Sequence, residues 1–236
     1  MVAVLFFVAA LLYSSVGHAG ASGYLAVMTF IGLAPVSMRP TALVLNLLVA
    51  AIGARAFIAA GHFRWSLTWP FLITSVPLAY LGGRLSLPVE AYRTVVGVVL
   101  LLSALRLVLQ LRALDVARRT PPAGLAMVVG ALLGFLSGLT GVGGGIFLSP
   151  LLLLAGWASL RSTAATSVVF ILANSAAGLL GQRDALNQLP EDMWQWAVAV
   201  IAGGLLGSWL GARQLPSPAI RLVLALVLVV AGVKLL

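Results

Sequence analysis

The chain has no cysteine and only two histidines, and both shortages restrict its chemistry. Without cysteine there can be no disulfides, no thiolate metal sites and no cysteine nucleophile. A zinc site built on His18 and His62 would need carboxylate ligands as well, and carboxylates are scarce in this sequence. We therefore expect the protein to use neither a metal nor another cofactor.

Charged residues are also scarce. They make up 8% of the 236-residue chain, whereas soluble domains carry about 25%. Hydrophobic residues account for 62% of the sequence. In lipid the backbone has to satisfy its own hydrogen bonds, which helices do within one segment. The composition therefore predicts an all-α, polytopic integral membrane protein, with the lipid bilayer as its surroundings and no nucleic acid as a partner.

The few acidic residues all fall outside the predicted membrane spans. There are five of them, Glu90, Asp115, Asp184, Glu191 and Asp192. A cation or proton transporter usually has a buried carboxylate as relay or counter-ion, and no span here offers one. Fourteen basic residues give a formal net charge of +9. Much of this excess is typical of the loops of membrane proteins, but it also favours a small anion as the substrate.

Apolar runs of about 20 residues, the length needed to cross a bilayer, predict spans at 41–60, 67–83, 91–111, 161–181, 193–212 and 217–236. Two longer segments, 2–34 and 123–156, each have a glycine-rich interruption near the middle. Together they give about eight membrane segments. Residues 1–21 have the small residues of a signal-peptide cleavage site, but no basic residue precedes their apolar core. We expect them to belong to the first segment.

The two halves of the chain resemble each other. This predicts a duplication, with 1–111 as the first membrane repeat, 112–122 as a polar linker and 123–236 as the second repeat. Arg39-Pro40-Thr41-Ala42 matches Arg161-Ser162-Thr163-Ala164, which lies 122 residues further on. If each interrupted segment crosses the membrane once, the copies are parallel. If each folds back as a hairpin, they are inverted, and the sequence leaves both arrangements open.

The second interruption is the richest in glycine and runs from Gly138 to Gly145. Glycine this dense breaks a helix, and a break at membrane depth survives only where protein, water or a ligand covers it. The helix expected at 146–154 would then begin with unpartnered N–H groups and the positive end of its dipole, which suits an anion. Close helix packing is the alternative, and it also explains the four-residue spacing of Gly130, Gly134 and Gly138 and of Gly203, Gly207 and Gly211. The predicted site residues here are Ser137, Thr140, Gly141, Gly143, Gly144 and Gly145.

The first interruption is less rich in glycine but more polar. Its candidate site residues are Ser15, Gly17, His18, Gly20, Ser22 and Gly23. His18 is the only ionisable side chain in either interruption, so it can hold an anion or sense pH. The alternative is a histidine that a backbone carbonyl satisfies at a helix interface.

Seven further polar residues lie just after the interruptions or inside the following spans. Asn46 and Asn174 either line a cavity or join helices, because a buried amide in lipid needs a partner. Thr163, Thr166 and Ser167 add hydroxyl groups to the second of these spans. Arg39 and Arg161 occupy matching positions, where they guide anions toward the interruptions or extend to the membrane surface.

These motifs resemble the TauE/SafE family, also called the sulfite exporter family. The resemblance rests on Gly134-Phe135-Leu136-Ser137-Gly138-Leu139-Thr140-Gly141-Val142-Gly143-Gly144-Gly145 followed by Pro150, on the first copy from Ser14 to Gly23, and on the Arg-x-Thr-Ala element of both halves. It implies an inner-membrane transporter of two related halves that carries small sulfur-containing anions such as sulfite or sulfonates. The first copy departs from the pattern, since it has Ala19, Ala21 and Ser22 in place of a glycine triplet.

The resulting hypothesis is a secondary transporter that moves a small sulfur-containing anion across the bacterial inner membrane by alternating access. It is not expected to be an enzyme. The alternatives are an anion channel and a membrane-embedded enzyme or assembly factor. The sequence leaves open which anion is carried, the direction of transport, proton coupling and whether the protein forms a homo-oligomer.

Overall fold

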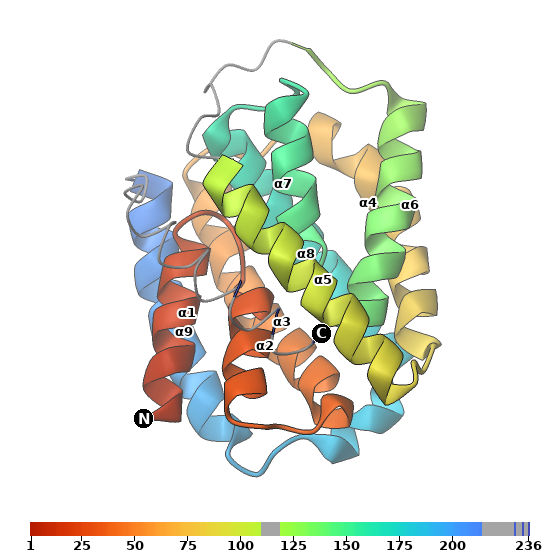
Figure 1. Cartoon of the computed structure of the whole chain (residues 1–236). Helices are drawn as coiled ribbons and strands as arrows, with labels where there is room; N and C mark the ends of the chain where they lie inside the picture. The colour runs from red at the N-terminus through yellow and green to blue at the C-terminus, as the bar shows by residue number, and fades with distance from the viewer. Residues whose placement is uncertain (110–118, 214–228, 230–232, 234–235) are drawn as a thin grey trace.

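The computed structural model describes residues 1–109, 119–213, 229, 233 and 236 (Figure 1). The long described ranges consist of helices and short connections: α1 (Val2–Ser14), α2 (Ala21–Phe30), α3 (Pro35–Ala59), α4 (Trp65–Arg84), α5 (Val89–Leu109), α6 (Ala123–Thr140), α7 (Gly145–Leu154), α8 (Leu160–Gly181), the 3₁₀ helix η2 (Arg183–Gln188) and α9 (Met193–Arg213). These ranges contain no strand, as an all-α membrane protein requires. Most of the predicted span 217–236 and most of the linker 112–122 lie outside the described residues.

Four described helices are long and apolar enough to cross a membrane, namely α3, α6, α8 and α9. The short helices α1 and α2 are apolar as well. Helices α4 and α5 lie where the spans 67–83 and 91–111 were predicted, although they are not among the four. The protein is therefore an all-helical, polytopic membrane protein.

Both glycine-rich interruptions are turns at which the chain reverses. Gly23 of α2 packs back against Ala9 and Tyr13 of α1, and Gly144 lies beside Leu133 and Ser137 of α6. In Figure 1, α1 runs upward from the N-terminus and α2 returns downward, whereas α6 runs downward and α7 returns upward. The sequence left open whether each interrupted segment continues in one direction or folds back as a hairpin. In the structure both segments fold back, and the two hairpins point in opposite directions.

Positive φ angles, which glycine adopts without strain, produce the second reversal. After α6 ends at Thr140, Gly141 has φ 82°, Gly143 has φ 81° and Gly144 has φ 74°. Any other residue at these positions would bring its Cβ against the backbone. We call residues 141–144 the second turn, and residues 15–20, which join α1 to α2, the first turn.

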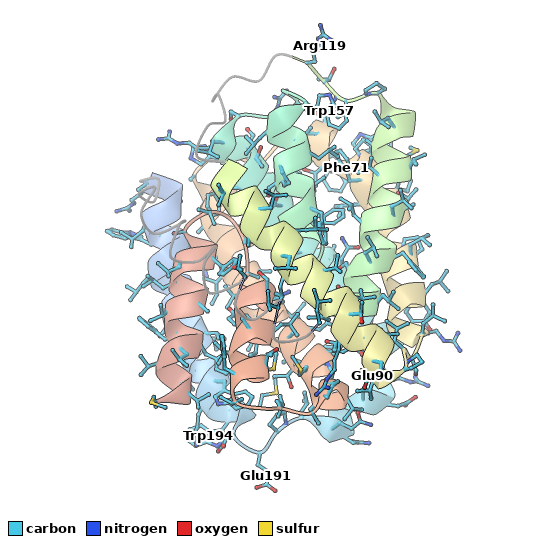
Figure 2. All side chains as sticks on the ribbon, in the orientation of Figure 1. Phe71, Glu90, Arg119, Trp157, Glu191 and Trp194 are labelled. Carbon is cyan, nitrogen blue, oxygen red and sulfur yellow. The ribbon has the colours of Figure 1, made fainter. Side chains whose placement is uncertain are left out.

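The long helices pack in a few closely contacting pairs. Helices α3 and α8 pack against each other at the centre, α1 packs along α9, and α6 packs along α4. Helix α3 also contacts α9, as α8 contacts α4. Figure 2 labels Arg119 and Trp157 at one end of the bundle, which we call the linker end, and Glu90, Glu191 and Trp194 at the other, which we call the far end.

Glycine stripes allow the closest of these contacts, as their spacing predicted. A Cβ added to Gly130, Gly134 or Gly138 would clash with backbone atoms of α4. A Cβ on Gly203, Gly207 or Gly211 would clash with the carbonyls of Phe7, Leu11 and Ser15 respectively. Backbones that approach this closely are typical of helix pairs in membranes. These glycines therefore serve packing.

We predict that Gly134→Ala destabilises the α4–α6 pair by about 1–3 kcal/mol, the usual cost of overpacking a close contact. The added methyl group would overlap backbone atoms of Ser75. Gly124→Ala is the matched control, because Gly124 lies on the same helix with nothing within 4 Å of the added Cβ. Thermal unfolding in detergent measures both variants, and equal melting temperatures would contradict the packing role.

Candidate functional site

The second turn leaves a row of backbone donors without partners. Helix α7 begins at Gly145, with Gly144 as its N-cap and no side chain capping it. Among the described residues, the N–H groups of Gly143, Gly144, Gly145 and Ile146 form no hydrogen bond. All four residues are buried. Buried N–H groups at a helix start, together with the helix dipole, form a binding site for an anion.

Polar side chains from three helices surround this row of donors. A Cβ on Gly143 would lie 2.9 Å from Asn46 Nδ2 of α3 and 3.2 Å from Ser175 Oγ of α8. A Cβ on Gly144 would lie 3.3 Å from the Cβ of Ser137 on α6. The hydroxyls of Ser137 and Ser175 are buried with no partner among the described residues. Buried polar groups are normally paired, so these unpaired hydroxyls are available to a ligand.

The two asparagines use their donors within the protein. Asn46 donates through Nδ2 to the carbonyl of Val142 in the second turn (3.3 Å), and Asn174 donates to the carbonyl of Phe170 on its own helix (2.8 Å). The Oδ1 atom of each amide is buried and has no partner among the described residues. Asn46 therefore both joins α3 to the second turn and leaves an acceptor unused.

Thr140 is the last residue of α6 and borders the second turn. Its hydroxyl donates to the carbonyl of Leu136 (2.7 Å) and accepts the N–H of Val142 (3.4 Å). Its carbonyl accepts from the hydroxyl of Tyr92 on α5 (3.3 Å). Thr140 therefore shapes the end of α6, and its hydroxyl is already engaged.

The first turn meets the second through His18, which is 3% exposed. Its Nε2 lies 3.2 Å from the carbonyl oxygen of Gly145 and 2.9 Å from the hydroxyl of Ser149 on α7. The Ser149 hydroxyl lies 2.6 Å from that of Ser167 on α8. Hydrogen bonds thus connect the first turn, the start of α7 and α8. Backbone carbonyls also contact the His18 ring, as the alternative reading of this residue expected, since Nδ1 lies 3.1 Å from the carbonyl oxygen of Val16.

The other predicted residues of the first interruption serve mainly the fold. Gly17 packs on the backbone of Ala164, Gly20 has φ 108° and is the N-cap of α2, and Gly23 packs on α1. The hydroxyl of Ser15 donates to the carbonyl of Leu12 (2.7 Å). Ser22 is buried near the start of α2.

Arg39 lies buried against the ends of two helices. Its Nε donates to the carbonyl of Gly138 (3.0 Å), its Nη1 to that of Leu85 (2.8 Å), and its Nη2 to those of Gly82 and Gly83 (both 2.7 Å). These carbonyls end α6 and α4, where the helix dipoles are negative. The Arg39 guanidinium therefore holds two helix ends together, and its predicted role in guiding anions stays a prediction.

The matching arginine of the second half has no such role. Arg161 is exposed at the start of α8. The two arginines are thus unequal, although the sequence gives them the same local motif. Only Arg39 lies where carbonyls of two neighbouring helices converge.

A cavity of about 370 Å³ opens near Arg39 at the end of α4, with Tyr92 and Gln182 in its lining. Because Tyr92 also contacts the carbonyl of Thr140, this cavity lies next to the second turn. Within the described ranges, no three His, Asp or Glu side chains gather closely enough to bind a metal.

The sulfite exporter TauE/SafE family model matches residues 2–235 of the chain. The chain belongs to this family. It is 43% identical over 238 residues to the "Probable membrane transporter protein y4hK" of Sinorhizobium fredii, covering 99% of this chain and 96% of the relative. It is also 27% identical over 117 residues to the "Probable membrane transporter protein YunE" of Bacillus subtilis, covering 48% of this chain and 41% of that protein. No solved structure matches the chain.

Membership in the TauE/SafE family and these relatives indicate a membrane transporter of the sulfite exporter type. The sequence predicted the glycines of the second turn as candidate site residues, but it did not predict Ser149 or Ser175. Ser149 is the one hydroxyl residue in the apolar run of α7, and this isolation was the available signal. Ser175 directly follows Asn174, which was itself a predicted site residue.

Proposed function

We propose that this TauE/SafE protein is a secondary transporter of small sulfur-containing oxyanions, such as sulfite or sulfonates, in the bacterial inner membrane. The observation that carries the proposal is the row of four buried N–H groups from Gly143 to Ile146, which have no partner among the described residues. Such a row binds the oxygens of an anion without needing a fixed cation. The family name supplies the sulfur oxyanion as the class of substrate.

The unpaired side chains near these donors favour an anion that also carries hydrogen. The amide oxygen of Asn46, a residue beside Gly143, is an acceptor with no partner among the described residues, so its partner has to be a donor. Hydrogen sulfite has an O–H group, and an aminosulfonate has an ammonium group. The hydroxyls of Ser137 and Ser175 serve either role. A fully deprotonated oxyanion would leave this amide oxygen unpaired.

Burial of the second turn supports alternating access over a permanently open channel. Gly143, Gly144 and Gly145 are enclosed by α6, α8 and their side chains, so a ligand enters only when the hairpins move. The opposed α1–α2 and α6–α7 hairpins and the matched helix contacts support an inverted duplication of 1–111 and 123–236. Inverted repeats are a common basis for alternating access. An anion channel and a membrane-embedded enzyme remain the alternatives to test.

The distribution of charge supports a cytoplasmic linker end. The described connections at that end have arginines and no acidic residue, including Arg64 and Arg119. At the far end, arginines lie among Glu90, Asp184, Glu191 and Asp192. Short cytoplasmic loops carry the excess of basic residues in membrane proteins.

We predict that Ser175→Ala raises the KM for sulfite by roughly 10- to 100-fold, the value of one hydrogen bond to a charged ligand. The purified protein in liposomes would take up radiolabelled sulfite, with sulfate and chloride as competitors. Because the Ser175 hydroxyl has no partner among the described residues, its removal should leave the stability unchanged or slightly higher.

Ser208→Ala is the matched control, since Ser208 is also buried without a partner among the described residues but lies on α9 against Gly53. It should transport sulfite normally. Saturable uptake that accelerates in counterflow supports a carrier, and uptake that does not saturate supports the channel. Normal sulfite affinity in Ser175→Ala would remove this residue from the site, and no sulfite flux by the wild type would refute the proposed substrate.

A further inference from the structure

We propose that the cavity beside Arg39 at the far end is a second anion-binding site, which holds a small oxyanion before it reaches the second turn. The inference rests on the proposed function, because it concerns the path of the anion to the start of α7. We call this cavity the outer site, and the row of N–H groups from Gly143 to Ile146 the inner site.

The outer site lies where several helices begin or end. Its lining comes from the starts of α3 and α5, the ends of α4 and α8, and η2. Glu90, the second residue of α5, marks this end of the bundle in Figure 2. The cavity measures about 370 Å³, within the range of about 300–1,000 Å³ that is usual for small-molecule sites. A small oxyanion therefore fits in it together with some water.

The outer and inner sites share a wall made of two side chains. Arg39 and Tyr92 both line the outer site. On its other side the Tyr92 hydroxyl donates to the carbonyl of Thr140 (3.3 Å), and a Cβ on Gly141 would lie 3.2 Å from Arg39 Cγ. Thr140 and Gly141 lead directly into the inner site. Arg39 and Tyr92 therefore stand between the two sites.

Arg39 removes the main obstacle to an anion in this cavity. The ends of α4, α6 and α8 lie at or next to it, and each helix end carries about half a negative elementary charge. Arg39 donates to carbonyls at the ends of α4 and α6, so its positive charge offsets about two of these half charges. Of the three ends, only that of α8 then remains. The starts of α3 and α5 outweigh it, because each carries about half a positive charge.

The charged side chains at the cavity add to this positive balance. Arg84 and Asp184 both line it. The fully exposed Asp184 carboxylate lies 3.9 Å from the guanidinium of Arg183, whereas Arg84 forms no ion pair within the ranges that the structure describes. The three exposed charges therefore sum to a positive value. Water screens them, but a positive entrance still raises the local concentration of anions.

Hydrogen-bond donors without partners also belong to the lining. The N–H groups of Val36 and Val89, in the first turns of α3 and α5, form no hydrogen bond with any described residue. Gln182 adds a side-chain donor, since its Nε2 is buried and likewise has no partner in the described part of the chain. The oxygens of an oxyanion are acceptors, so an oxyanion in the outer site supplies what these donors lack.

The two sites act in series. An anion that arrives at the far end exchanges part of its water for the donors of the outer site and waits beside Arg39. It reaches the inner site when movement of the hairpins separates Tyr92 from Thr140.

The absence of native cysteine allows a direct test with single thiols in the full chain. Ser86→Cys places a thiol on an exposed residue of the outer-site lining. Thr94→Cys is the matched control, because Thr94 is exposed on α5 outside this lining and bonds to the Glu90 carbonyl of its own helix. N-ethylmaleimide adds a bulky, stable group to either thiol, and mass spectrometry measures the labelled fraction.

Excess maleimide is removed before liposomes with each protein receive radiolabelled sulfite. We expect the adduct on Ser86→Cys to reduce sulfite uptake by at least about tenfold relative to the same protein without the adduct, as for a loss of 1.4 kcal/mol of binding. The adduct on Thr94→Cys should leave uptake unchanged. Because each protein is compared with its own unlabelled form, an effect of the substitution on folding does not enter the result.

A second reading measures binding without transport. Methanesulfonate, a small sulfonate that does not react with maleimides, should slow the labelling of Ser86→Cys in a saturable way, by about twofold where half of the sites are filled. Labelling of Thr94→Cys should not change. The protection should persist when Ser86→Cys is combined with Gly143→Ala, whose added methyl group contacts Asn46 and Ser175 at the inner site.

The outcomes separate the outer site from the proposed function. Normal sulfite uptake by labelled Ser86→Cys, or protection that disappears with Gly143→Ala, overturns the outer site. Protection that persists without any sulfite flux by the wild type keeps the outer site as an anion site and overturns the proposed transport instead.

Discussion

Arg39→Ala is expected to lower the free energy of unfolding by about 3 kcal/mol or more. The substitution removes hydrogen bonds to four carbonyls, those of Gly82, Gly83, Leu85 and Gly138. Each buried carbonyl that loses its donor costs about 1–3 kcal/mol, and water entering from the neighbouring cavity offsets part of this cost. Thermal and denaturant unfolding of the purified protein in detergent measures the effect.

Arg161→Ala is the matched control, because it removes the arginine of the same motif from an exposed position. Its effect should stay within about 0.5 kcal/mol, as is usual for surface substitutions. Arg39→Lys should recover only part of the stability, since an ammonium group cannot reproduce the planar fork of donors. Equal losses for Arg39→Ala and Arg161→Ala would show that the carbonyl contacts contribute little.

Gly143→Ala is expected to reduce sulfite flux by at least about tenfold, the effect of losing 1.4 kcal/mol of binding. The new methyl group would lie 2.8 Å from Ile171 Cγ2 and 2.9 Å from Asn46 Nδ2. It would occupy the space between Asn46 and Ser175 beside the unpartnered N–H groups. Uptake by liposomes, with the amount of folded protein determined in parallel, measures this loss.

The control for backbone strain is Gly61→Ala. Gly61 has φ +74°, close to the φ of +81° at Gly143, but nothing lies within 4 Å of its added Cβ. Both variants therefore pay about 1–2 kcal/mol for a left-handed alanine, and only Gly143→Ala alters the proposed site. If both variants transported sulfite equally well, the second turn would not be where the anion binds.

The sequence predicted the helices and the two interruptions well, because these depend on local properties. Apolar runs of membrane length and dense glycine are both visible without tertiary contacts. The direction of the chain after each interruption was not predictable in the same way. It depends on the φ angles of Gly141, Gly143 and Gly144 and on the contact of Gly144 with α6, which the composition of the segment does not determine.

The part of the candidate site that depends on local sequence could also be predicted, and the part that depends on tertiary contacts could not. The N–H groups of the second turn follow from the broken helix itself, so their positions could be read from the glycines. The different surroundings of Arg39 and Arg161 could not, because they arise where α4 and α6 end beside α3. Ser149 acquires its role only from its distances to His18 and Ser167, which belong to other segments of the chain.

The unequal surroundings of the two turns have a consequence for the energetics of the transport cycle. Asn46 donates to the second turn only, and Ser175 lies beside it. A carrier with two identical halves would have the same free energy whether it faced the cytoplasm or the outside. Under the proposed alternating access, the two hairpins would exchange different hydrogen bonds as they move, so one facing state would be the preferred resting state. Under the proposed mechanism, sulfite would therefore have different apparent affinities on the two sides of the membrane, while the gradient alone would still set the direction of net flow.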